Sequence, residues 1–219
     1  VVVGEGGTAV VRECIHRYSG ERYAVKRPLR NKVGLQNLHN ELRILQVCVN
    51  ESNPGIPLLE DFFYDSDDNL FVVMELLTGG ELLDQIVKED HFTEYHAKET
   101  VRKILVGLSY LHSKGIAHRD LKPENLVFSH SGEDSPLKIV DFDLAKLLGA
   151  GETTTPCGTS HYMAPEMVGG HKYRLAVDMW SLGCIVFILL CGRYPFWADT
   201  RNERDRRIYN CEYEFHPKL

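Results

Sequence analysis

The polar run His118-Arg119-Asp120-Leu121-Lys122-Pro123-Glu124-Asn125 constrains this chain more than any other feature. It is followed, 21 residues after Asp120, by Asp141-Phe142-Asp143. Carboxylate and amide oxygens are the ligands that magnesium prefers. A carboxylate near a lysine can orient a hydroxyl group while the lysine neutralises a migrating phosphate. The run therefore predicts a loop that brings a metal site and an acceptor site together, held in place by a folded core.

The run closely resembles the catalytic loop of protein kinases, and Lys122 with Glu124 looks like the serine/threonine branch. The resemblance implies that Asp120 orients the acceptor hydroxyl and that Lys122 neutralises the γ-phosphate of ATP. It also implies that Asn125 and Asp141 bind Mg²⁺. Thr159, in the later segment GTSHYMAPE, completes the implied catalytic set by bonding to Asp120 and Lys122.

The composition argues against several other classes of protein. With 43% hydrophobic and 26% charged residues in 219, the chain has an ordinary globular composition and can bury a sizeable core. A net charge of −6 argues against nucleic acid as a partner. The most apolar run, Ile185 to Cys191, is shorter than the roughly 20 residues of a membrane-spanning helix. Six cysteines without a C-x-x-C pair favour an intracellular location, in the cytoplasm or the nucleus.

The first fifty residues carry a second group of features in the order found in kinases. An apolar strand meets Gly4-Glu5-Gly6-Gly7, whose glycines let backbone N–H groups approach phosphates. Lys26 ends an alternating strand 15 residues after Val11, and Glu41 lies on a helix predicted from Leu35 to Val47. The resemblance makes Lys26 the lysine that holds the α- and β-phosphates and Glu41 its partner.

The segment from Glu75 to Glu81 changes from a strand pattern to glycines, and the resemblance makes it the hinge beside adenine. Met74 is then the gatekeeper, and backbone groups of Glu75 and Leu77 bond to the ring. An apolar slot with few polar groups suits a nucleobase. The ATP-binding residues implied in this way are Gly4, Glu5, Gly6, Gly7, Val11, Ala24, Lys26, Glu41, Met74, Glu75, Leu77, Glu81 and Val127.

The implied architecture is α+β, a two-lobed protein-kinase fold that forms one kinase domain. Residues 1–74 are the N-terminal lobe, a small antiparallel sheet with one key helix. Residues 75–81 are the hinge, and residues 82–219 are a larger, mostly helical lobe. Kinase domains normally continue for two or more helices beyond the position of Leu219, so the C-terminal helices are expected to be truncated.

Asp143 departs from the family pattern, because most kinases have glycine at this position. Glycine permits backbone angles that are costly for other residues, although aspartate tolerates left-handed geometry better than most. Asp143 also adds negative charge beside the metal site. The triplet is similar to that of the MAP-kinase-interacting kinases, in the calcium/calmodulin-dependent-kinase-like group, where it is associated with an inactive arrangement. Asp143 is therefore predicted to be regulatory.

The segment from Asp141 to Glu166 resembles the kinase activation segment. Thr155 aligns with the usual activating phosphosite, so an upstream kinase is an expected partner. Arg119 supplies a guanidinium that a phosphothreonine can engage through charge-assisted hydrogen bonds.

Two acidic residues have expected structural roles. Asp178, at the start of an apolar helix, needs hydrogen-bond donors if it is buried, and in kinases it accepts them from the backbone near His118. Glu166 normally has an arginine partner, and no arginine after it is obviously placed for that role.

The expected function is ATP-dependent phosphorylation of serine or threonine in protein substrates. Glu81 and Glu124 match positions that accept an upstream arginine, while Ile188 replaces a second carboxylate, so one basic residue is predicted. A pseudokinase or regulatory binding module is the alternative. It is favoured by Asp143 and the missing end, and opposed by the presence of the catalytic set. A small-molecule kinase conflicts with Lys122-Pro123-Glu124 and GTSHYMAPE, which look like protein-substrate machinery.

Overall fold

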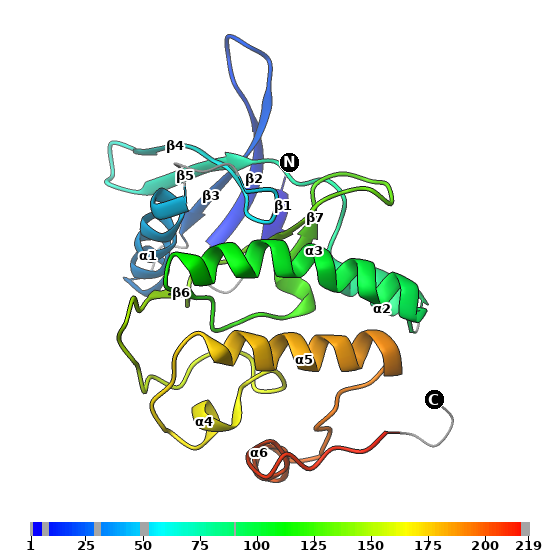
Figure 1. Ribbon diagram of the computed structural model, residues 1–219. Helices are drawn as coiled ribbons and strands as arrows, with labels where there is room; N and C mark the ends of the chain where they lie inside the picture. The colour runs from blue at the N-terminus through cyan, green and yellow to red at the C-terminus, as the bar shows by residue number, and fades with distance from the viewer. Residues whose placement is uncertain (1, 6–8, 29–31, 49–52, 90, 216–219) are drawn as a thin grey trace.

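A computed structural model describes residues 2–5, 9–28, 32–48, 53–89 and 91–215, and these form a small β-sheet part above a larger helical part (Figure 1). The sheet is antiparallel, with the strand order β1-β2-β3-β5-β4. Its elements are β1 (Val2–Glu5), β2 (Ala9–Ile15), β3 (Arg22–Pro28), α1 (Lys32–Cys48), β4 (Leu59–Tyr64) and β5 (Leu70–Glu75). The helix predicted from Leu35 to Val47 and the two strands flanking residues 65–69 are confirmed.

Strand register places the predicted cavity residues on one face of this sheet. Lys26 of β3 lies opposite Val11 of β2, and Ala24 lies opposite Met74 of β5. Residues directly opposite each other in an antiparallel pair point to the same face, as do residues two apart on one strand. Val11, Ala24 and Lys26 therefore share a face.

The helical part is built around two long helices, α3 and α5 (Figure 1). Thr93 caps α3, as its sequence predicts, by accepting a hydrogen bond from His96 N at 3.2 Å. The α5 helix is apolar almost all round, which is typical of a helix buried in a core. The elements are α2 (Leu82–Glu89), α3 (Glu94–Ser113), β6 (Ile116–Ala117), a 3₁₀ turn (Pro123–Asn125), β7 (Leu126–Phe128), β8 (Leu137–Ile139), β9 (Lys146–Leu147), α4 (Pro165–Val168), α5 (Ala176–Cys191) and α6 (Arg201–Tyr209).

The loop before β4 joins the two parts. Gly55 packs so closely on α3 that a Cβ atom at this position would lie 2.4 Å from the Cα of Gly107. Ile139 N of β8 donates to Gly55 O at 2.9 Å. Glycine at both positions is required because the two backbones touch.

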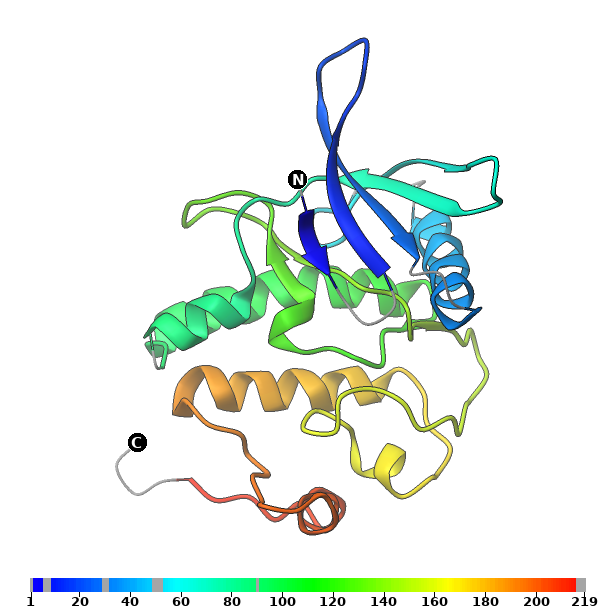
Figure 2. The same ribbon diagram turned by 180° about the vertical axis from the view of Figure 1, so that it is seen from behind.

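Seen from behind, the chain between α3 and β7 passes between the sheet and α5 (Figure 2). The predicted catalytic loop lies on this stretch, so both parts of the molecule can contribute to one site. Within the described residues, no helix is both long and apolar enough to cross a membrane.

Candidate active site

Asp178 fixes the backbone of the predicted catalytic loop. Its side chain is fully buried, Oδ2 accepts from His118 N at 2.9 Å, and Oδ1 accepts from Arg119 N at 2.8 Å. His112 Nε2 of α3 lies 2.9 Å from Oδ2. Arg119 has a φ of 69°, a left-handed conformation that costs energy for most residues and persists only where the surroundings impose it. The predicted bond between Asp178 and the loop is present, and His112 is a further partner that the sequence did not reveal.

Asp120 is held by groups on both sides of the loop. Thr159 N donates to Asp120 Oδ1 at 2.7 Å, and Lys122 Nζ lies 3.2 Å from Asp120 Oδ2. Lys122 also donates to Thr159 Oγ1 at 3.2 Å, while Asn125 Nδ2 donates to Asp120 O at 2.9 Å. The four residues predicted to be catalytic are thus brought together, with the contacts expected among Asp120, Lys122 and Thr159.

Lys26 stands in a cluster of three carboxylates. Its Nζ lies 2.6 Å from Glu41 Oε2, 3.1 Å from Asp143 Oδ1 and 3.2 Å from Asp141 Oδ1. Lys26 and Glu41 are only 7% and 3% exposed, so water screens this pair weakly, whereas the Asp141 side chain is 40% exposed. The predicted pair of Lys26 and Glu41 is formed, and Asp143 adds a contact that the sequence alone did not predict.

The cluster carries more negative than positive charge. Burial alone would lower the pKa of the Lys26 ammonium, but the three carboxylates outweigh burial and raise that pKa well above its ordinary value. Burial alone would raise the pKa of Asp141, but the Lys26 ammonium outweighs it and holds that pKa below its usual range. Both groups are therefore charged at neutral pH, and one ammonium faces three acidic groups.

The residues present fit a magnesium ion. Asn125 donates its Nδ2 hydrogen to Asp120 O, which leaves its carbonyl oxygen to accept from elsewhere or to bind a cation. That oxygen and the Asp141 carboxylate are hard donors of the kind that Mg²⁺ selects. One oxygen each of Glu41, Asp141 and Asp143 lie within 4.8 Å of one another, and Lys26 Nζ contacts all three residues, so acidic groups outnumber basic ones beside Asp141.

Left-handed backbone geometry occurs at Asp141 rather than at Asp143. Asp141 has a φ of 64°, whereas Asp143 is not among the described residues with positive φ. The backbone angles that glycine adopts more readily than other residues are therefore not used at position 143. Phe142 is 1% exposed and packs edge-on against His118, with ring centroids 5.4 Å apart. The Asp141-Phe142-Asp143 triplet is therefore present together with a formed ion pair between Lys26 and Glu41.

A cavity of about 650 Å³ lies between the sheet and the catalytic loop. Its lining includes every predicted ATP-binding residue that the structure describes, namely Gly4, Glu5, Val11, Ala24, Lys26, Glu41, Met74, Glu75, Leu77, Glu81 and Val127. Gly6 and Gly7 lie outside the described residues. Of the two predicted metal residues, Asp141 lines the same cavity, whereas Asn125 is not part of its lining.

An ion pair that the sequence did not reveal fixes Glu75, the first residue of the predicted hinge. Lys138 Nζ of β8 lies 2.8 Å from Glu75 Oε2 and donates to Ile56 O at 3.1 Å. Leu58 N donates to the same Glu75 oxygen at 3.1 Å. The Glu75 N–H itself donates to Leu58 O at 2.9 Å, so this group is not the one that meets adenine. Lys138 has no local sequence signal, because its partners lie far away along the chain.

Glu81 and Glu124 both line the mouth of the cavity. Burial raises the pKa of Glu81, and the neighbouring carboxylates of Asp84 and Glu124 raise it further. Glu124 Oε2 is buried and has no hydrogen-bond partner among the described residues. A buried acidic oxygen without a donor is costly, so this corner of the site favours a cationic ligand.

Tyr173, which follows the activation segment, connects that segment to Arg119 of the catalytic loop. Arg119 Nη1 donates to the Tyr173 hydroxyl at 3.2 Å, and this hydroxyl donates to Thr155 O at 2.5 Å. Thr155 is exposed, whereas Thr153 is buried and accepts from Lys146 Nζ at 3.0 Å. The predicted phosphosite and Arg119 are therefore neighbours through Tyr173, whose role the sequence did not reveal.

Glu166 of α4 is the acidic residue for which the sequence offered no obviously placed arginine. Among the described residues no ion pair to its carboxylate is found, and its backbone oxygen accepts from His171 N at 2.8 Å.

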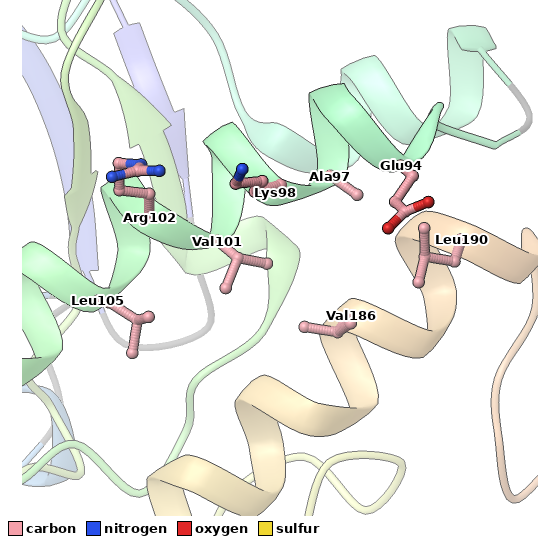
Figure 3. Close-up of a pocket in the computed structure, with 8 residues that line it drawn as sticks. All are labelled: Glu94, Ala97, Lys98, Val101, Arg102, Leu105, Val186 and Leu190. Carbon is pink, nitrogen blue, oxygen red and sulfur yellow. The ribbon is translucent and has the colours of Figure 1, made fainter.

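A separate groove of about 470 Å³ lies between α3 and α5 (Figure 3). Val101 and Leu105 of α3 point toward Val186 of α5, and Lys98 and Arg102 stand at the edge. Its lining combines apolar side chains with the charged Glu94, Lys98 and Arg102, and it holds none of the predicted catalytic residues. The chemistry of the molecule therefore belongs to the cavity beneath the sheet.

The fold and this site have the arrangement of a nucleotide-dependent phosphotransferase. The protein kinase domain family matches residues 1–217, and the chain belongs to this family. The predicted two-lobed α+β kinase fold is thereby confirmed.

Several protein kinases are similar to the chain along most of its length. A probable myosin light chain kinase of Dictyostelium discoideum is 43% identical over 217 residues, which cover 97% of this chain and 61% of that protein. Human calcium/calmodulin-dependent protein kinase type IV is 42% identical over 216 residues, covering 97% and 44%. Calcium/calmodulin-dependent protein kinase type 1 of Caenorhabditis briggsae is 41% identical over 200 residues, which cover 90% of this chain and 54% of that protein. The chain thus spans about half the length of these relatives.

Proposed function

We propose that the chain transfers the γ-phosphate of ATP to serine or threonine hydroxyls of protein substrates. The observation that carries this proposal is the Asp120 carboxylate, held by Thr159 N and Lys122 in the same loop as Glu124, which lines the cavity that contains Lys26 and Asp141. A base, a phosphate-neutralising cation and metal-binding oxygens are the parts that phosphoryl transfer needs.

In this mechanism Asp120 orients the acceptor hydroxyl and takes its proton. The hydroxyl oxygen forms a bond to the γ-phosphorus while the bond from that phosphorus to the bridging oxygen of ADP breaks, and ADP leaves with the bonding electrons. Lys26 holds the α- and β-phosphates, and Lys122 neutralises charge on the migrating group. Positioning and charge neutralisation supply most of the acceleration.

Asn125 and Asp141 are proposed to hold Mg²⁺, and the family generally uses ATP with this ion. When bound, the ion would neutralise phosphate charge. Support comes from the hard oxygen donors of both residues and from the surplus negative charge around Lys26.

A substrate with one upstream arginine is proposed. The raised pKa of Glu81 and the unpartnered oxygen of Glu124 support this choice, because a guanidinium would satisfy both carboxylates. A positional peptide library without enrichment of upstream basic residues would exclude it.

Similarity to myosin light chain and calcium/calmodulin-dependent kinases supports a place in the calcium/calmodulin-dependent-kinase-like group. A relation to the MAP-kinase-interacting kinases rests on the Asp141-Phe142-Asp143 triplet and on the surrounding phrases GIAHRDLKPEN and SPLKIVDFDLAK. Activation by an upstream kinase at Thr155 and an intracellular location belong to the same proposal. The residues whose loss would indicate a binding-only module, Lys26, Asp120 and Asp141, are all present.

The test is transfer of radiolabelled phosphate from ATP and Mg²⁺ to an arginine-containing serine peptide. We expect Asp120→Asn to lose activity by about 10²- to 10⁴-fold, because the proton acceptor is removed. Exposed Asp199→Asn is the matched control and should behave as the wild type. Asp143→Gly should transfer faster if Asp143 restrains Lys26. Absence of transfer from the wild type and from Asp143→Gly, before and after phosphorylation of Thr155, would favour the binding-module alternative.

A further inference from the structure

Asn40 of α1 contacts the chain just beyond the metal site. Its Nδ2 donates to three backbone oxygens, those of Phe142 at 3.2 Å, Asp143 at 3.3 Å and Ala145 at 2.8 Å. These oxygens belong to a turn that Ala145 N closes by donating to Phe142 O at 3.0 Å. A primary amide has only two N–H hydrogens, so the three acceptors share them. One side chain thus contacts three of the backbone oxygens of this turn, while the Leu144 oxygen accepts from Arg119 Nε.

Glu41, the residue after Asn40 on α1, contacts the sheet. Glu41 pairs with Lys26 of β3, at 2.6 Å. Adjacent residues of α1 therefore bind two different partners, with Glu41 on the sheet and Asn40 on the turn that follows Asp141. The turn lies more than 100 residues further along the chain, so its closeness to α1 depends on contacts of this kind.

We propose that Asn40 is a positioning residue that couples the place of α1 to the place of the Asp141 segment. The pair of Lys26 and Glu41 and the metal-binding Asp141 then reach their working positions together. Without the amide, three backbone oxygens lose a shared donor, and α1 loses a direct bond to the turn. The inference rests on the proposed kinase function for its kinetic consequences, but the bond itself can be tested without activity.

Two variants separate hydrogen-bond donation from simple packing. Asn40→Ala removes the donor and some volume. Asn40→Asp keeps the shape of the side chain but replaces the N–H donors with an anionic oxygen, which repels the three backbone oxygens. If donation matters, aspartate is the worse replacement, whereas if packing matters, alanine is the worse one. Gln46→Ala, at an exposed amide on the same helix, is the matched control.

The first experiment is steady-state kinetics on the wild type and these variants. We expect Asn40→Ala to lower kcat/KM for ATP about tenfold and Asn40→Asp to lower it further, since one lost hydrogen bond corresponds to roughly that factor. KM for the peptide should not change, because Asn40 contacts neither the acceptor loop nor Glu81 and Glu124. Gln46→Ala should match the wild type. Equal loss in all variants, or a greater loss for alanine than for aspartate, would overturn the proposal.

The second experiment is amide hydrogen exchange on the same proteins without nucleotide. We expect faster exchange in both α1 and residues 142–148 for the two Asn40 variants, with no change in α5. This result would support the coupling even if the wild type transferred no phosphate, in which case the proposed function fails separately. Unchanged exchange in either segment would overturn the coupling, whatever the kinetics show.

Discussion

The replacement Asp178→Asn tests whether one buried carboxylate holds the catalytic loop. The two side chains have nearly the same shape, so packing is retained. In one orientation the new amide nitrogen faces the His118 N–H, and in the other it faces the Arg119 N–H. Either way, a buried backbone donor meets another donor instead of an acceptor.

The cost follows from these bonds. An unsatisfied buried donor costs about 1–3 kcal/mol, and hydrogen bonds to a charged group contribute roughly 1.5–3 kcal/mol each. We therefore expect the free energy of unfolding to fall by about 2–4 kcal/mol. For a domain of this size that loss lowers Tm by roughly 4–16 °C. A second effect is expected on kcat, because Asp120 follows the two anchored residues directly.

Urea unfolding followed by tryptophan fluorescence measures the loss, since Trp180 lies on the same helix as Asp178. Asp199→Asn, an exposed aspartate changed in the same way, should leave the free energy of unfolding unaltered. A loss below about 1 kcal/mol would show that the carboxylate is not what holds the loop, because a single orphaned donor already costs that much.

Three further predictions concern the cavity and the activation segment. Glu41→Gln should raise KM for ATP and lower kcat, together by about tenfold or more, because the buried Lys26 ammonium loses its closest partner; steady-state kinetics measures both. KM for an arginine-containing peptide should rise as pH falls, because Glu81 in its proposed role attracts arginine only when it is ionised. The raised pKa of Glu81 means that this weakening of peptide binding is centred above pH 4.5, the pKa of an ordinary glutamate. Kinetics at several pH values measures this KM. Tyr173→Phe should destabilise the protein by about 1 kcal/mol, since Arg119 and Thr155 O lose the bridging hydroxyl, and thermal unfolding measures that change.

Each of these has a matched comparison. Glu60→Gln, at an exposed position, should leave ATP kinetics unchanged, and an equal effect there would contradict the first prediction. A peptide with alanine in place of arginine should show no such pH dependence, and parallel curves for both peptides would contradict the second. Tyr95→Phe, at an exposed tyrosine, should not alter Tm, and a similar drop in both variants would remove the special role of Tyr173.

The sequence predicted those parts of the site whose residues lie close together along the chain. The loop from His118 to Asn125 and the triplet at Asp141 carry their residue types at fixed spacing, so roles could be predicted before any geometry was known. The partnership of Lys26 with Glu41 followed from resemblance, and the structure shows it at 2.6 Å.

The contacts that the sequence did not reveal join residues far apart along the chain. Asn40 meets a turn more than 100 residues away, and Lys138 meets Ile56 82 residues away. An asparagine on a helix and a lysine in a strand are usually solvated, so neither carries a local signal. Asp143 shows the opposite case, in which an unusual residue in a known motif attracted attention, yet the left-handed backbone lies two positions earlier, at Asp141.

The loop from Asn53 to Leu58 has a consequence for how the two lobes move. Although it precedes β4 in the chain, it is bonded to β8 through Gly55 O and Ile56 O, and its Gly55 backbone rests on α3. Mechanically this loop belongs to the helical lobe. We therefore expect this loop to stay with the helical lobe if the strands of the sheet shift when a nucleotide enters or leaves the cavity. Glu75 is bonded both to Leu58 of this loop and to Lys138 of β8, so we expect it to shift least.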